Sequence, residues 1–179
     1  MTKIKLKGHE FDAISVKDSF QRKTVQFRNK IIDTLSKLGL TEDDEDIPIN
    51  TLAIKKAPAF ASWYFNGYRL HYSYQGAAKF VDNLYVVFKV IELEVSELLD
   101  EKKTVDEFIR EFSEDDDVEA QRNEARETLG VSHDTLDLGL IDKKFKALAK
   151  EHHPDMPNGD HDKFKAINRA HKILKRELQ

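Results

Sequence analysis

Two amphipathic helical segments near the C-terminus are separated by a proline that neither helix can accommodate. Pro154 has no backbone N–H and disfavours helical backbone angles at His153, so the first helix must end there. In both segments the apolar residues recur at helical spacing and form one stripe. These stripes are Ile141, Phe145, Leu148 and Ala149, then Phe164, Ile167, Ala170, His171 and Leu174. Two helices whose stripes face each other form an antiparallel hairpin, and we expect that fold here.

The tripeptide His153-Pro154-Asp155 falls in the loop at the tip of this predicted hairpin. Pro157 and Gly159 follow it and keep the loop non-helical. Asp155 is therefore expected on an exposed turn. A polar tripeptide held in that position is typical of a surface that contacts a partner.

The region from Gln121 to Leu178 resembles the J-domain, the co-chaperone module that stimulates ATP hydrolysis by Hsp70-type chaperones. The tripeptide alone is weak evidence, because it is short enough to recur by chance. The resemblance also rests on the helix on each side and on a Leu-Gly-Val run upstream. The matching segments are Leu129-Gly130-Val131, Phe145 to Lys150, His153-Pro154-Asp155 and Lys163 to Asn168, with Ala170 and Leu174.

The resemblance implies docking on an Hsp70, where the tripeptide favours the hydrolysing state. His153, Pro154 and Asp155 would take that role, and basic residues of the second helix would face an acidic surface of the partner. Those basic residues are Lys143, Lys144, Lys146 and Lys150. The implied J-domain core is Leu129, Phe145, Leu148, Ala149, Phe164, Ile167, Ala170 and Leu174.

Some positions depart from the family pattern. Asp142 and Ala147 stand where members often carry basic residues, and His171 stands where an aromatic residue usually packs. Ala125 and Arg126 replace the usual aromatic pair of the first helix. These departures leave open a second reading, a scaffold whose J-domain no longer stimulates Hsp70.

The composition fits a two-part globular protein of 179 residues, of which 40% are hydrophobic. We expect an α+β domain over residues 1–115 and an all-α J-domain over residues 116–179. No cysteine, signal peptide or membrane-length apolar run is present, which favours a cytoplasmic protein without disulfides. The segment from Glu92 to Glu119 is strongly acidic and could restrain the basic third helix through charge.

The N-terminal domain is expected to combine long helices with an aromatic β-hairpin. Asn66-Gly67 lies between two aromatic-rich runs, which predicts a type I′ turn with positive φ at both residues. Ile91 to Val95 alternates like a strand inside a predicted helix. The other expected elements are a strand over Lys3–Lys7, helices over about Asp18–Leu38 and Phe80–Asp100, and a capping box from Thr104 to Glu107.

Other functional classes fit the sequence less well than a co-chaperone does. The basic segment Lys163–Arg176 could bind nucleic acid, but the net charge of −4 and the missing aromatic platform favour a solvated face. His152, His153, Asp155, His161 and Asp162 could suggest a metal site, yet Pro154 separates them and we expect no metal. No enzymatic motif or cofactor site is found in residues 1–115, which we expect to select a client or a location. An enzyme is therefore not expected, nor is a membrane partner.

Overall fold

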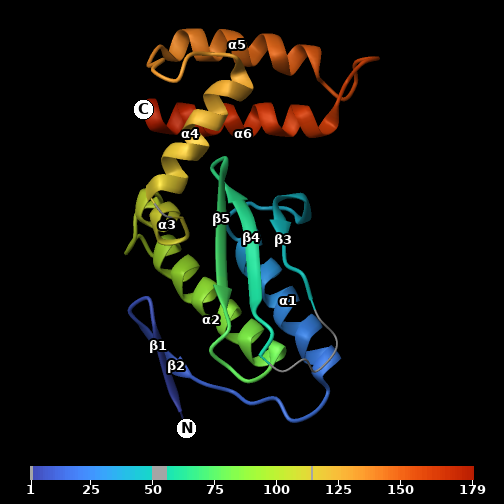
Figure 1. Ribbon diagram of the computed structural model, residues 1–179, viewed down its shortest axis with the longest axis vertical. Coiled ribbons are helices and arrows are strands. Elements are labelled where there is room, and N and C mark those ends of the chain that lie inside the picture. Colours follow the sequence, from blue (N-terminus) through green and yellow to red (C-terminus); the bar gives the residue numbers. More distant parts are fainter. Residues whose placement is uncertain (1, 50–55, 114) are drawn as a thin grey trace. The chain divides into compact units, whose positions relative to one another are not determined.

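The computed structural model describes residues 2–49, 56–113 and 115–179 (Figure 1). These residues divide into two compact units. Of the described residues, the first unit contains 2–49, 56–63 and 70–112, and the second contains 64–69, 113 and 115–179. The first unit is α+β and the C-terminal region is helical, so the predicted fold class is confirmed. The predicted boundary after residue 115 stays a prediction, because the division by contact also assigns a short internal segment to the second unit.

Two small antiparallel sheets and three helices make up most of the first unit. A two-stranded sheet pairs β1 with β2, and a second sheet has the order β3-β4-β5. Figure 1 shows α1 and α2 side by side, with the second sheet over them. The elements are β1 (Lys3–Leu6), β2 (His9–Asp12), α1 (Phe20–Ser36), a 3-10 turn (Glu42–Asp44), β3 (Glu45–Asp46), β4 (Ala59–Phe65), β5 (Tyr68–Tyr74), α2 (Phe80–Leu99) and α3 (Val105–Glu111).

The predicted aromatic hairpin is present as β4 and β5. Asn66 and Gly67 have φ values of 50° and 85°, so both central residues of the turn are left-handed, as a type I′ turn requires. Along β4 the side chains alternate between buried and half-buried positions. The hairpin prediction is therefore confirmed, including its turn.

The helix predictions for residues 80–111 are also confirmed. Helix α2 is continuous from Phe80 to Leu99, so the alternation at Ile91–Val95 does not mark a strand. Ile91, Glu94 and Val95 are all buried, because this helix is covered on most of its faces. Thr104 and Glu107 form the predicted capping box at the start of α3, with both reciprocal hydrogen bonds in place.

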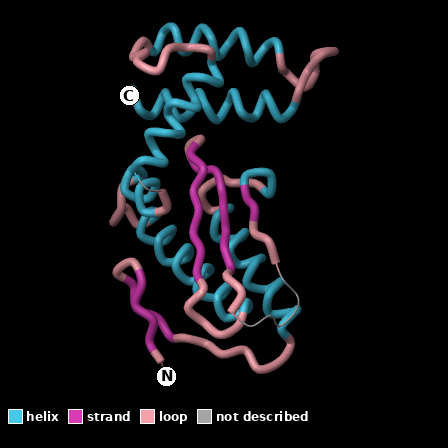
Figure 2. The backbone as a smooth tube through the Cα atoms, viewed as in Figure 1, coloured by secondary structure: helices cyan, strands magenta, loops and turns pink. Residues whose placement is uncertain are grey.

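Three helices form the C-terminal part of the second unit: α4 (Asp115–Leu129), α5 (Leu138–Glu151) and α6 (His161–Leu178). Helices α5 and α6 are antiparallel, and α4 packs across α6 (Figure 2). Leu129, at the end of α4, is fully buried, as predicted for the residue that joins the first helix to the hairpin. Among the described residues, no helix is long and apolar enough to cross a membrane.

Candidate functional site

The loop between α5 and α6 presents the tripeptide to solvent. Helix α5 ends at Glu151 with His152 as its C-cap, and Asp160 caps α6 by accepting hydrogen bonds from the backbone N–H groups of Asp162 and Lys163. These two bonds lower the pKa of Asp160, the bond from Lys163 having the larger effect. The tripeptide thus lies between two fixed helix ends.

Within the loop, His153 makes the contacts that order the tripeptide. Its Nδ1 accepts a hydrogen bond from the Asp155 backbone N–H at 3.2 Å, and its ring meets Phe164 edge to face at 5.1 Å. Its carbonyl accepts from the Met156 N–H at 2.9 Å. The Asp155 side chain is 90% exposed. His153 therefore shapes the turn, and the Asp155 carboxylate points to solvent.

Gly159 closes the loop through a close backbone approach. A Cβ atom at Gly159 would lie 2.1 Å from the His153 carbonyl oxygen, a distance that no side chain tolerates without a backbone shift. Its N–H donates to the Met156 carbonyl at 2.9 Å. The sequence predicts only that this glycine keeps the loop non-helical. The structure shows that its missing side chain also allows the tripeptide loop to fold back on itself.

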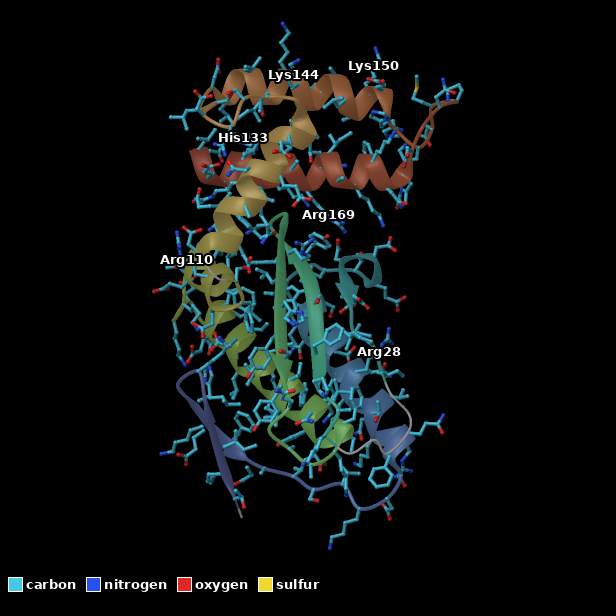
Figure 3. The ribbon with its side chains drawn as sticks, in the orientation of Figure 1. Arg28, Arg110, His133, Lys144, Lys150 and Arg169 are labelled. Carbon is cyan, nitrogen blue, oxygen red and sulfur yellow. The ribbon has the colours of Figure 1, made fainter. Side chains whose placement is uncertain are left out.

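The four predicted lysines of α5 are exposed: Lys143, Lys144, Lys146 and Lys150. Figure 3 shows Lys144 and Lys150 projecting from α5 on the side away from α6. Helix α5 leads directly into the tripeptide loop, so the four exposed lysines and the exposed Asp155 lie on one helix and the loop that follows it. We call this surface, made of the four lysines and residues 153–155, the docking face.

Two departures from the family pattern turn out to be partners. His171 Nε2 and Asp142 Oδ1 lie 2.6 Å apart and join α6 to α5, and the His171 ring stacks on Phe145 at 4.0 Å. The hydrogen bond from His171 is the main cause that lowers the pKa of Asp142 below its ordinary value of 3.8, and Lys146 and Lys175 contribute less. Asp142 therefore belongs to the helix–helix contact.

The Asp142–His171 contact predicts a specific acid sensitivity. Because the folded-state pKa of Asp142 is depressed, its contribution to stability is present above the unfolded value and is lost as pH falls through the folded value. The Tm difference between the natural chain and Asp142→Asn, measured by circular dichroism, should therefore shrink as the pH falls through and below 3.8, the ordinary pKa of this carboxyl. In a His171→Phe background, which keeps a ring on Phe145, that pH dependence should disappear. A Tm difference that stays constant over this range would contradict the assignment.

The predicted core is only partly enclosed. Leu129, Ile167, Ala170 and Leu174 are buried as expected. Phe145, Leu148, Ala149 and Phe164 are half-buried instead. Helix α5 packs mainly against α6 and less against α4, and the two phenylalanines contact histidine rings. The buried set also includes Val118, Ala125 and Ile173. Helix α4 and the second half of α6 thus form more of the core than the stripes predicted.

Arg126 has a structural role that the sequence did not predict. It is 3% exposed and donates from Nε and Nη2 to the Thr135 carbonyl, at 3.3 and 3.2 Å. Its Nη2 also lies 3.0 Å from a carboxylate oxygen of Glu177. One side chain thus ties α4 to the α4–α5 loop and to the last turn of α6. The one sequence signal for this role is that Arg126 stands where the family usually has an aromatic residue.

Outside the docking face, one cluster in the first unit has the donor types of a metal site. His9, Glu94 and Glu97 offer ligand atoms within 4.8 Å of one another, and Glu94 is fully buried. Lys103 Nζ, however, already contacts Glu94 and lies 3.7 Å from Glu97. A cation would have to displace this ammonium group. We therefore interpret the cluster as a partly buried ion-pair network around Glu94.

Comparison with known families agrees with this geometry. The DnaJ domain family model matches residues 126–179, which include α5, the tripeptide loop and α6. No curated protein and no solved structure gave a significant match to the chain. Residues 126–179 are therefore similar to the DnaJ domain, and the predicted resemblance is confirmed over this part of the chain. At the level of the family, a DnaJ domain implies Hsp70 co-chaperone function.

Proposed function

We propose that this protein docks on an Hsp70-type chaperone through the docking face and stimulates its ATP hydrolysis. The observation that carries the proposal is the His-Pro-Asp loop inside the matched region, held by Gly159 and Phe164 with the Asp155 carboxylate 90% exposed. An ordered loop that presents an exposed carboxylate is suited to binding a partner.

The chemistry of the docking face defines the complementary surface. Asp155 would accept a charge-assisted hydrogen bond from a basic group of the chaperone, which is stronger than a bond between neutral groups. The exposed lysines of α5 would meet an acidic surface, which favours fast and correctly oriented association more than high affinity. The partner is therefore expected to place one basic group beside an acidic region.

In this proposal the protein is an allosteric partner and has no catalytic residues. Stimulation requires that the docking face bind the hydrolysing state of the chaperone more tightly than its other state. The first unit would select the client or the location. The chain has no cysteine, which is compatible with action in the cytoplasm.

The proposal is tested by ATP hydrolysis of an Hsp70 from the same source, with the intact chain added over a range of concentrations. We expect a saturable rise in steady-state and single-turnover rates. The concentration needed for half-stimulation should rise with ionic strength, because exposed lysines contribute to association. Binding without any stimulation would favour the scaffold reading instead. Stimulation that is insensitive to salt would contradict the role of the lysines.

A further inference from the structure

The turn of the β4–β5 hairpin, residues 64–69, lies within the second unit although it is distant in sequence from the DnaJ domain. Gln121, on α4, bonds to both backbone groups of Arg69. Its Oε1 accepts from the Arg69 N–H at 2.6 Å, and its Nε2 donates to the Arg69 carbonyl at 3.2 Å. Gln121 is only 8% exposed, so these bonds satisfy a nearly buried amide.

Helix α6 contacts the same turn through its backbone and through Arg169. A Cβ atom at Gly67 would lie 2.3 Å from the Arg169 carbonyl oxygen and 2.9 Å from Ile173 Cγ1, so only glycine fits. The Arg169 guanidinium stacks over the Tyr64 ring at 3.5 Å. Figure 3 shows Arg169 extending from α6 toward this turn. The turn is therefore in direct van der Waals contact with α6.

Tyr68 completes the contact. Tyr68 is only 2% exposed, and its hydroxyl accepts a hydrogen bond from Arg122 Nε at 3.2 Å. Small residues on the helices, Ala125 and Ala170, are buried beside the turn and line a cavity of about 100 Å³ together with Gly67. Small side chains at these positions let the backbone of the turn approach both helices.

We propose that residues 64–69 are a structural brace of the DnaJ domain, which fixes α4 against α6. The turn contacts residues of α4 and α6, whereas the docking face lies on α5 and the following loop. The brace therefore supports the helical hairpin without covering the tripeptide. This inference rests on the proposed function. If both hold, Hsp70 stimulation depends on residues 64–69, which lie more than 50 residues before the family match.

A matched pair of glycine variants in the full chain tests this proposal. Gly8, in the turn between β1 and β2, has φ 80° after Lys7 at φ 49°, which matches Gly67 at φ 85° after Asn66 at φ 50°. A Cβ atom at Gly8 meets nothing within 4 Å. Alanine at either site thus brings the same backbone strain, and only Gly67→Ala adds the clash with α6.

The readout is amide hydrogen exchange, resolved by segment. We expect Gly67→Ala to accelerate exchange in α4 and α6 at least about tenfold, and Gly8→Ala to leave these helices unchanged. Gln121→Ala removes both bonds to Arg69 without adding a clash and should accelerate exchange in the same helices. The proposal is overturned if both Gly67→Ala and Gln121→Ala leave α4 and α6 unchanged, or if Gly8→Ala affects them equally.

The same variants separate this inference from the proposed function. Gly67→Ala and Gln121→Ala should weaken Hsp70 stimulation in proportion to the loss of protection in α4 and α6. If the intact chain fails to stimulate any Hsp70, the proposed function fails, while the exchange data still decide whether the brace exists. Accelerated exchange with full Hsp70 stimulation would overturn the dependence of stimulation on the brace.

Discussion

Replacing Asp155 with asparagine is expected to raise the concentration of this protein needed for half-maximal stimulation of Hsp70 by about ten- to hundredfold. The substitution keeps the size of the side chain and removes the charge from a group that is 90% exposed. Loss of one hydrogen bond to a charged group costs about 1.5–3 kcal/mol, or roughly ten- to hundredfold in binding to the hydrolysing state. Single-turnover ATP hydrolysis measures this effect directly.

His153→Gln should raise this concentration as well, for a different reason. Glutamine cannot reproduce both the ring contact with Phe164 and the Nδ1 acceptor for the Asp155 N–H, so the carboxylate is no longer held in place. Asp162→Asn is a matched control, because it neutralises an exposed acid at the same end of the hairpin outside the tripeptide. Circular dichroism should be unchanged in all three variants. An unchanged half-maximal concentration for Asp155→Asn would show that the tripeptide is not the contact.

Replacing Arg126 with leucine is expected to produce the largest loss of stability. The substitution leaves Glu177 without its cation and the Thr135 carbonyl without its donor. Breaking a buried pair by removing one partner costs about 3–5 kcal/mol, and the 18% exposure of Glu177 places this case at about 3 kcal/mol. In a domain of this size, that corresponds to a fall in Tm of roughly 12–24 °C, measurable by calorimetry.

A second variant distinguishes the ion pair from general packing. In Arg126→Leu/Glu177→Leu both charges are absent, so the double variant should recover a large part of the lost stability. Lys172→Leu, at an exposed position of α6, should change the Tm by much less and serves as the control for added apolar surface. If the double variant is no more stable than Arg126→Leu alone, the pair is not the source of the effect.

Several elements were predictable because their signals are local. The Asn66-Gly67 turn, the Thr104–Glu107 capping box and the break at Pro154 each depend on backbone preferences of a few adjacent residues. The structure has all three where the sequence places them. Helical periodicity likewise predicted α5 and α6, although the half-buried Phe145 and Phe164 show that a stripe indicates a face and not its depth.

Other features could not be predicted because they depend on partners far away in the chain. In the sequence, Asp142 and His171 are only departures from the family pattern, and the structure shows that they contact each other at 2.6 Å. Arg126 likewise departs from the family pattern in the sequence, and its contacts with Thr135 and Glu177 show its structural role. Gly159 was assigned to the loop, but its close approach to the His153 carbonyl became visible only in three dimensions.

The sequence by itself determined the identity of the tripeptide, the helices on either side of it and the family that the C-terminal region resembles. Those properties follow from short-range backbone preferences and from apolar periodicity, which are written in neighbouring residues. The tertiary structure alone decided that residues 64–69 pack with α4 and α6. That contact joins groups 52 residues apart in the sequence. The need for glycine at position 67 and the hydrogen bonds of Gln121 arise only when the folded chain brings these residues together.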